Sequence, residues 1–512
     1  MTNKFMKSIS KRREFITQFD NKYNFIIEKE NLRAISIKGG TLSFISQFVA
    51  FIMQMVTTMV LARLITPNDY GLVGMVTAIT GFMHIFRDLG LSTATVQKKH
   101  LTISDVSSLF WINVSIGFII FILLIIFSNQ IAIFYNEPKL KLITYTISLG
   151  FVISSLGSQH QALLQRTMKF TIITKGQIVS NIVSALIGIF LAINSFGYWS
   201  LIIMQLVNPL ILTVYFWVKV DWKPLFIVNI KKSRHLIKFG SYITGFDIVN
   251  YISRNLDNVL IGKFINSAAV GLYSKAYQIL MLPIQQLRGP LGQVSMPALS
   301  LLQNNKMEFK KYYLKFLNIL SFISIPIVCL MLLNSKHIIL FFLGEQWIES
   351  IPLFQTLALT AIIQPLIGTL GILLMAYGNS KKYFYWGIMN TIVIVISLVI
   401  GVFQGLLILT WSYTIANYLM FIPSLIFCLK NTDISVGDFT KSLLSPLISS
   451  IAATLASYYI LSFGYFPDKP LIHLVSSTFI YIPIYFILYG LHPLSRKELE
   501  SHIKIIREII KI

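Results

Sequence analysis

Charged residues are scarce in this sequence: they make up only 12% of its 512 residues, while 55% are hydrophobic. A soluble domain carries roughly 25% charged residues, so a water-soluble globule of this length would lack the polar surface needed to cover its core. Acidic residues are the scarcest, with 20 Asp and Glu against 43 Lys and Arg. A soluble multidomain protein is therefore excluded in favour of a membrane protein.

Cysteine is also nearly absent, because Cys329 and Cys428 are the only two and both lie in apolar runs. This excludes a disulfide framework and a cysteine-based metal site. No Walker A sequence is present, so an ATPase is not expected. No Asp/Glu pair or histidine cluster lies on a large outer loop, because the longest expected outer loops, 129–141 and 336–351, are short. We expect no catalytic residues, no metal and no cofactor, and hence no enzyme.

Apolar runs of about the 20 residues that a membrane-spanning helix requires recur along almost the whole chain. They predict an all-α integral membrane protein with about fourteen transmembrane helices. The runs cover residues 42–62, 72–94, 109–128, 142–163, 178–194, 197–218, 238–261, 269–290, 316–335, 352–376, 384–402, 405–428, 443–463 and 471–490.

The Lys and Arg residues set the expected topology. If the N-terminus lies in the cytoplasm, thirty-three of the 43 fall on the cytoplasmic side and six on the other side. The remaining four, Arg87, Arg254, Lys275 and Arg288, lie in helices or at their ends. The positive-inside rule then predicts a bacterial inner-membrane protein with both termini in the cytoplasm. It also accounts for the net charge of +23 without a nucleic-acid partner.

A shift of 200 residues superimposes parts of the chain on itself. Leu61–Ile65 then lies on Ile261–Ile265, and Gly71–Leu72 lies on Gly271–Leu272. Two repeats of six helices start on the same side of the membrane, so they are parallel. We therefore expect two six-helix lobes, 39–218 and 236–430, around a central cavity.

The other expected segments surround these lobes. They are a basic cytoplasmic tail over 1–38, with no cleavable signal peptide, a basic linker over 219–235, two further helices within 431–490, and a tail helix over 491–512. The tail helix has capping-box spacing at Ser495–Glu498 and one apolar face. We expect it to lie on the cytoplasmic membrane surface, and a plain soluble tail helix is the alternative.

Ionisable residues inside a membrane span are costly and usually face a cavity or a partner. The seventh predicted helix carries Asp247, Arg254 and Asp257, and the repeat places Gln47 and Gln54 of the first helix opposite 247 and 254. These residues are candidates for the lining of the central cavity. The alternative is an Arg254–Asp257 ion pair that neutralises itself between helices.

Two further arginines, Arg87 and Arg288, fall near equivalent ends of the second and eighth helices. Arginine binds phosphate through two parallel charge-assisted hydrogen bonds, so these residues are candidates for an anionic headgroup site. The alternative is that both side chains extend to the cytoplasmic interface. His160, at the end of the fourth helix, is expected at that interface as well.

Several motifs resemble a known family. Lys38-Gly39-Gly40, followed by Leu61 to Leu72 with the sequence LARLITPNDYGL, resembles the first hairpin of Wzx-type polysaccharide flippases. Arg87 to Ser92 and Asp257 to Gly262 continue the match, which covers essentially the whole chain. The chain is similar to the colanic-acid and teichuronic-acid exporter subgroup of the multidrug/oligosaccharidyl-lipid/polysaccharide (MOP) superfamily.

The resemblance implies that the chain flips oligosaccharide units linked to undecaprenyl pyrophosphate from the cytoplasmic to the outer leaflet, for cell-surface polysaccharide synthesis. Its partners would be membrane lipids and polysaccharide polymerase machinery. The resemblance supplies no residue roles, and the chemistry of that substrate assigns them instead. Arg254 would hold the pyrophosphate at mid-depth, with Arg87 and Arg288 at the entry and Gln54 and Gln47 in the cavity. Asp247 or Asp257 would carry a coupling H⁺ or Na⁺. The alternatives are a lipid II flippase, a multidrug exporter, and a membrane enzyme or ligase that acts on lipid-linked sugars.

Overall fold

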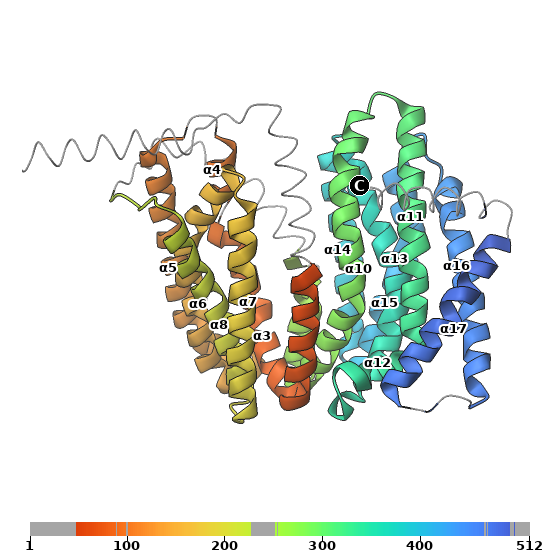
Figure 1. The fold of residues 1–512 in the computed structure, drawn as a ribbon, viewed down its shortest axis with the longest axis horizontal. Helices are drawn as coiled ribbons and strands as arrows, with labels where there is room; N and C mark the ends of the chain where they lie inside the picture. Colours follow the sequence, from red (N-terminus) through yellow and green to blue (C-terminus); the bar gives the residue numbers. More distant parts are fainter. Residues whose placement is uncertain are drawn as a thin grey trace, which may run out of the picture. The chain divides into compact units, whose positions relative to one another are not determined.

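The computed structural model describes residues 48–88, 90–98, 101–226, 251–252, 254–464, 467, 469–491 and 496, and these residues form helices and their connections without a strand (Figure 1). The chain divides into two compact units, Met1–Asn255 and Leu256–Ile512. The all-α prediction is confirmed. Asp247, Gln47, the 1–38 tail and the capping box of the tail helix lie outside the described residues.

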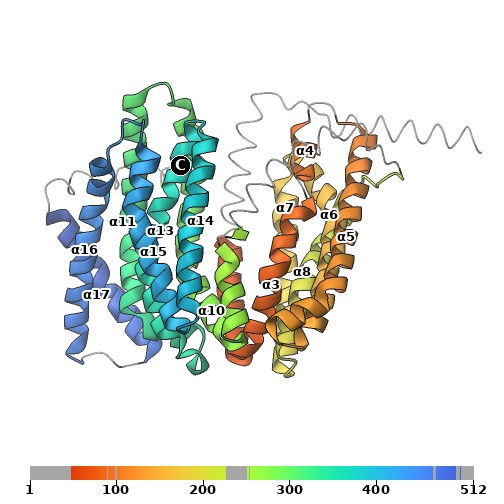
Figure 2. The same ribbon diagram turned by 180° about the vertical axis from the view of Figure 1, so that it is seen from behind.

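The first unit is a bundle centred on α6, which packs against α3, α4, α5 and α8. α7 packs mainly against α8 at the side of this bundle (Figures 1 and 2). The helices are Phe48–Leu64, α3 (Pro67–Asp88), α4 (Leu91–Gln97), α5 (Ile103–Tyr135), α6 (Lys139–Arg166), α7 (Phe170–Ile193) and α8 (Tyr198–Lys219).

The second predicted span, 72–94, falls within a candidate membrane span over Pro67–Gln97, in which α3 ends at Asp88 and α4 begins at Leu91. Gly90, which precedes α4, has φ 70° and ψ 11°, in the left-handed region. Glycine adopts this conformation without the steric cost that a Cβ imposes.

The second unit is centred on α13, which packs against α10, α11, α14 and α15, while α16 packs on α11 and α17. α14 and α15 face the viewer in Figure 2, which is seen from behind, and so lie on the far side in Figure 1. The elements are a helix over 254–264, α10 (Ser267–Leu301), α11 (Lys306–Leu333), α12 (Ser335–Phe342), the short helix η1 (Glu345–Trp347), α13 (Ser350–Ala376), α14 (Ser380–Val402), α15 (Leu406–Leu429), α16 (Val436–Ser462) and α17 (Pro470–Leu491).

Polar caps explain where several helices begin. Thr102 and Asp105 form a capping box at the start of α5, and Ser435 and Asp438 form another at the start of α16. In each box, the hydroxyl accepts a hydrogen bond from the third helical N–H, and the carboxylate accepts one from the cap residue's own N–H. Asn266 caps α10 in the simpler one-sided way, through Ala269 N at 2.8 Å.

The outer surfaces of the helices are strongly apolar. Along α5, for example, Phe118, Ile119, Ile126 and Phe127 are each more than half exposed. Such a surface would aggregate in water but suits lipid. Eleven helices of the described part are long and apolar enough to cross a membrane.

The predicted count of fourteen spans is therefore not confirmed. The helix Phe48–Leu64 is shorter than a span over its described residues, and α10 is not among the eleven. The seventh predicted helix, 238–261, is described only from residue 251 onward.

Small residues let helices approach closely inside the first unit, as is usual in membrane proteins. A Cβ on Gly157 of α6 would lie 2.7 Å from Thr213 Oγ1 on α8, and one on Gly117 of α5 would lie 2.8 Å from Ser155 Oγ on α6. These contacts fix α6 between α5 and α8, and α6 and α8 together form most of the site described next.

Candidate functional site

The first unit contains a polar cavity of about 310 Å³ between α3, α6 and α8. Its polar groups are the side chains of His84 and Arg87 from α3, Ser154 from α6 and Gln205 from α8. The rest of the lining is apolar or without a side chain: Ile147, Gly150, Leu206 and Pro209. A charged guanidinium and three further polar groups thus converge inside an otherwise apolar bundle.

The cavity reaches the middle of two helices. Ser154 lies about 22 Å along α6 from Lys139 and about 18 Å before Arg166, given a rise of 1.5 Å per residue. Gln205 lies about 10 Å along α8 from Tyr198 by the same measure. Arg87, in the last turn of α3, therefore shares a cavity with residues far from either end of their helices.

Backbone features of α6 and α8 leave the cavity open. Gly150 contributes no side chain, and a Cβ there would reach only ordinary contact with Leu206 at 3.4 Å. Pro209 lies inside α8 and has no N–H, so the carbonyl of Gln205, four residues earlier, loses its usual helical donor. The missing hydrogen bond loosens α8 beside the cavity, where the side-chain amide of Gln205 lies.

His84 and Gln205 are exposed, whereas Arg87 and Ser154 are half-buried. The imidazole of His84 packs on the buried ring of Phe151 with 4.5 Å between the ring centroids. Ser154 donates its hydroxyl proton to Gly150 O at 2.6 Å, so its oxygen lone pairs remain for an incoming donor. The cavity therefore combines hydrogen-bond donors and acceptors.

The second unit has a separate buried cluster around Asp257. This residue is only 9% exposed, and its carboxylate accepts hydrogen bonds from Tyr273 Oη at 2.9 Å and from Asn258 N at 2.7 Å. Tyr273 lies on α10, so the cluster joins that helix to the one over 254–264. These hydrogen bonds offset part of the cost of burying the carboxylate in an apolar bundle.

Gln364 on α13 extends the polar interior of this unit. Its side-chain nitrogen donates to Tyr277 Oη at 3.1 Å and to Tyr413 Oη at 3.4 Å. Lys275, also on α10, donates to Gln278 Oε1 at 2.9 Å. Three helices, α10, α13 and α15, are therefore linked by amide and phenol groups within the apolar bundle.

The other predicted site residues lie in different surroundings. Arg288 donates to Gly368 O of α13 at 3.3 Å, and its guanidinium lies against the bare Cα of that glycine. Arg254 and Gln54 are exposed. Arg87 belongs to the first unit, whereas Asp257 and Arg288 belong to the second. Sequence reasoning missed Gln205 and Gln364, although each is an amide residue within an apolar run.

The expectation for His160 is wrong. Its side chain is fully buried, and its ring stacks on Trp217 at 4.6 Å and lies 5.0 Å from the ring of Trp222. Trp222 follows α8, and the neighbouring Leu225 accepts a hydrogen bond from Trp111 Nε1 at 3.0 Å. The segment after α8 thus folds back over the ends of α5 and α6 and covers the histidine.

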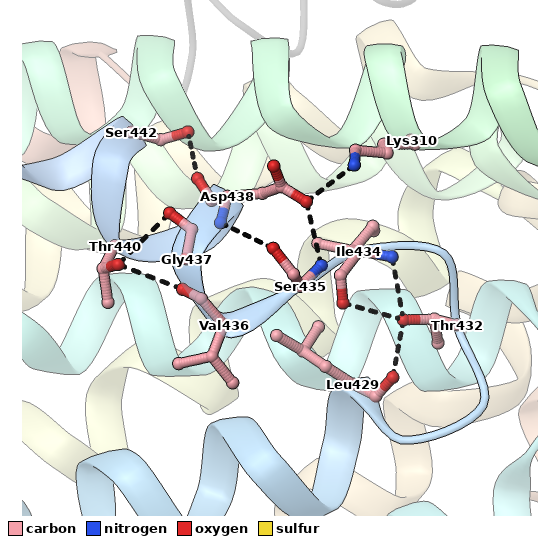
Figure 3. A network of polar contacts seen from close by, with 10 residues as sticks. All are labelled: Lys310, Leu429, Thr432, Ile434, Ser435, Val436, Gly437, Asp438, Thr440 and Ser442. Carbon is pink, nitrogen blue, oxygen red and sulfur yellow. Dashed lines mark hydrogen bonds and ion pairs between the residues drawn. The ribbon is translucent and has the colours of Figure 1, made fainter.

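Two basic residues bind groups at helix ends. Arg166 Nη1 donates to the carbonyls of Thr95, Val96 and Lys98 at the end of α4, at 2.6–3.1 Å. Lys310 on α11 pairs with Asp438 in the capping box of α16, as Figure 3 shows. These cations have a structural role.

Comparison with solved structures identifies the fold. The lipid II flippase MurJ, in its inward closed conformation, superimposes with a TM-score of 0.71. The match covers 88% of this chain and 98% of MurJ at 18% sequence identity. The two proteins share a transporter fold, and the all-helical architecture predicted from the sequence is the one observed.

Three curated proteins match most of the chain. Teichuronic acid biosynthesis protein TuaB of Bacillus subtilis (strain 168) is 26% identical and covers 82% of this chain and 88% of its own. Lipopolysaccharide biosynthesis protein WzxC of Escherichia coli (strain K12) is 25% identical, and the match covers 84% of this chain and 88% of WzxC. Succinoglycan biosynthesis transport protein ExoT of Rhizobium meliloti (strain 1021) is 23% identical, and the match covers 87% of this chain and 91% of ExoT.

A family model supports the same assignment. The model described as "Polysaccharide biosynthesis protein" matches residues 60–352, more than half of the chain. This range includes Arg87, Gln205, Asp257 and Arg288. The resemblance to Wzx-type flippases is confirmed, and the chain belongs to the polysaccharide biosynthesis protein family.

Proposed function

We propose that this protein is a flippase that carries lipid-linked oligosaccharide units across the membrane for polysaccharide synthesis, and that it is not an enzyme. The observation that carries the proposal is the polar cavity at Arg87, inside a helical lobe whose outer surface is apolar. Membership of a polysaccharide biosynthesis family and the flippase fold support the same assignment.

The physics of the substrate explains the need for such a cavity. A pyrophosphate and a polar glycan lose their hydration in hydrocarbon, which costs several kcal/mol or more per group, whereas a polyprenyl tail can remain in lipid. We assign the pyrophosphate to Arg87, Arg254 and Arg288, because guanidinium groups bind phosphate oxygens in pairs. Gln54 and Gln47 would contribute further hydrogen bonds during passage by alternating access.

The source of energy is an ion gradient or the membrane potential in this proposal. Asp257, buried and hydrogen-bonded to Tyr273, would bind the coupling H⁺ or Na⁺, and Asp247 is the second candidate. Movement would run from the cytoplasmic to the outer leaflet of the inner membrane. Both termini would lie in the cytoplasm, and polymerase machinery would receive the units on the far side.

The test uses purified full-length protein in liposomes that contain a polyprenyl-pyrophosphate oligosaccharide. A membrane-impermeant glycosidase would measure how fast the glycan reaches the outer leaflet. We expect movement that requires the protein and that Arg87→Ala or Arg254→Ala slows, while Arg166→Ala, which lies at a helix end, slows it much less. Glycan transfer to another molecule without leaflet exchange would replace the flippase by an enzyme.

A further inference from the structure

We propose that the cavity at His84, Arg87, Ser154 and Gln205 binds one sugar unit that carries, or adjoins, an anionic group. This inference deepens the proposed function and rests on it, because it names the part of the substrate that the first unit recognises. The anion, a phosphate or a sugar carboxylate, contacts Arg87. The hydroxyl groups of the ring contact the other three polar residues.

The mixture of donors and acceptors favours a sugar ring over an isolated anion. A phosphate ion offers mainly acceptor oxygens, so a site for phosphate alone would be lined with donors. Here Ser154 has its proton engaged with Gly150 O and presents acceptor lone pairs. The side-chain amide oxygen of Gln205, which lines the cavity, is a further acceptor. Acceptors of this kind need the O–H donors that a sugar provides.

The apolar part of the lining fits the same ligand. Ile147, Leu206 and Pro209 form the rest of the wall, and the C–H faces of a sugar ring pack against such groups. A cavity of about 310 Å³ is at the lower end of the 300–1,000 Å³ that small-molecule sites occupy, so it suits one unit and not a chain of several.

Gly150 gives the sharpest way to test the site. A Cβ at this position makes only ordinary contact with Leu206, so the helix tolerates a side chain there, yet a larger side chain would fill the cavity. We therefore choose Gly150→Leu as the blocking variant. Gly387→Leu is its matched control, because a Cβ on Gly387 meets no atom within 4 Å.

The binding experiment uses the full chain in lipid nanodiscs and isothermal titration with four soluble probes. These are glucose 1-phosphate, glucuronate, glucose and inorganic phosphate. We expect the two anionic sugars to bind more tightly than glucose or phosphate, and their order identifies phosphate or carboxylate as the preferred anion. Arg87→Gln should weaken binding of the anionic sugars by roughly 10- to 100-fold, the usual effect of losing a charge-assisted hydrogen bond.

Two more variants separate the sugar from the anion. Gln205→Leu should weaken sugar phosphate but leave inorganic phosphate unchanged, and Gln177→Leu, exposed on the neighbouring α7, should change neither. Gly150→Leu should abolish binding of every sugar probe. Equal binding of phosphate and sugar phosphate, or sugar binding that survives Gly150→Leu, would overturn the proposal.

The liposome assay distinguishes the two levels of inference. If wild-type protein moves the lipid-linked glycan but Gly150→Leu moves it equally well, the cavity assignment fails and the flippase stands. If the cavity binds anionic sugars and Gly150→Leu abolishes this, but no glycan crosses, the cavity assignment stands and the flippase fails.

Discussion

Lys310 Nζ lies 2.6 Å from Asp438 Oδ2, and the same carboxylate oxygen accepts a hydrogen bond from Ser435 N at 2.9 Å (Figure 3). One oxygen therefore completes the capping box of α16 and ties that helix to α11. Ser435 Oγ in turn accepts a hydrogen bond from Asp438 N at 3.0 Å. The junction combines a helix cap with an ion pair.

The two functions of Asp438 predict an order of stability. The ion pair is partly exposed, so its loss in Lys310→Met or Asp438→Asn should cost below about 1 kcal/mol. The cap is worth about 1 kcal/mol, so Ser435→Ala should lower the unfolding temperature more than Lys310→Met, and Asp438→Ala should lower it most. Thermal unfolding in detergent measures the order. A larger loss for Lys310→Met than for Ser435→Ala would show that the pair dominates.

The contact between α14 and α15 predicts the effect of a single methyl group. A Cβ on Gly401 would lie 2.7 Å from Leu409 Cα, a backbone atom that cannot rotate away. Gly401→Ala should destabilise the protein by about 1–3 kcal/mol, as other overpacked sites do. Gly387→Ala on the same helix is the control and should be neutral. Equal unfolding temperatures for the two variants would contradict the close approach.

The burial of Trp222 predicts how much the segment after α8, which covers His160, contributes to the stability of the protein. Its side chain is 1% exposed and packs on the rings of Phe110 and His160. Trp222→Ala should cost about 3–5 kcal/mol, the usual range for a large aromatic truncated in a core. Trp411→Ala removes a side chain that is 43% exposed and should cost much less. Thermal unfolding compares the two, and similar losses would mean that the segment is weakly held.

The assignment of the coupling ion to Asp257 predicts how transport depends on the ion gradient. Asp257→Asn keeps an acceptor for Tyr273 but removes the charge, so transport should lose its dependence on the gradient in liposomes. Tyr273→Phe removes the hydrogen bond of 2.9 Å and should change the ion concentration for half-maximal rate. Tyr385→Phe, at an exposed position, should change nothing. Full transport with unchanged ion dependence in Asp257→Asn would remove this residue from the coupling site, and Asp247→Asn would then be tested.

Much of the helical organisation was predictable, because each span must supply its own apolar surface to lipid. The runs 109–128, 142–163 and 352–376 fall within α5, α6 and α13. Local breaks were less predictable. The interruption between α3 and α4 depends on the left-handed backbone conformation of Gly90, and α12 occupies a segment that was expected to be a loop.

The polar residues show more clearly how much of the candidate site could be predicted from the sequence. Arg87 was a candidate from the sequence because a cation in an apolar run is costly. Gln205 was not, because a neutral amide in an apolar helix is tolerated and can face any side. The burial of His160 was not predicted, because it depends on a contact with Trp222, which follows α8 and packs against the histidine of α6.

The sequence by itself determined that this protein is an all-helical membrane protein, where most of its helices run, and which family its motifs resemble. These properties depend on local composition and on residues close together in the chain. The tertiary structure decided that Arg87 of α3 shares a cavity with Ser154 of α6 and Gln205 of α8. That meeting requires helices packed side by side at a definite rotation. The rotation is set by close contacts such as Gly157 against Thr213, and no single helix encodes it.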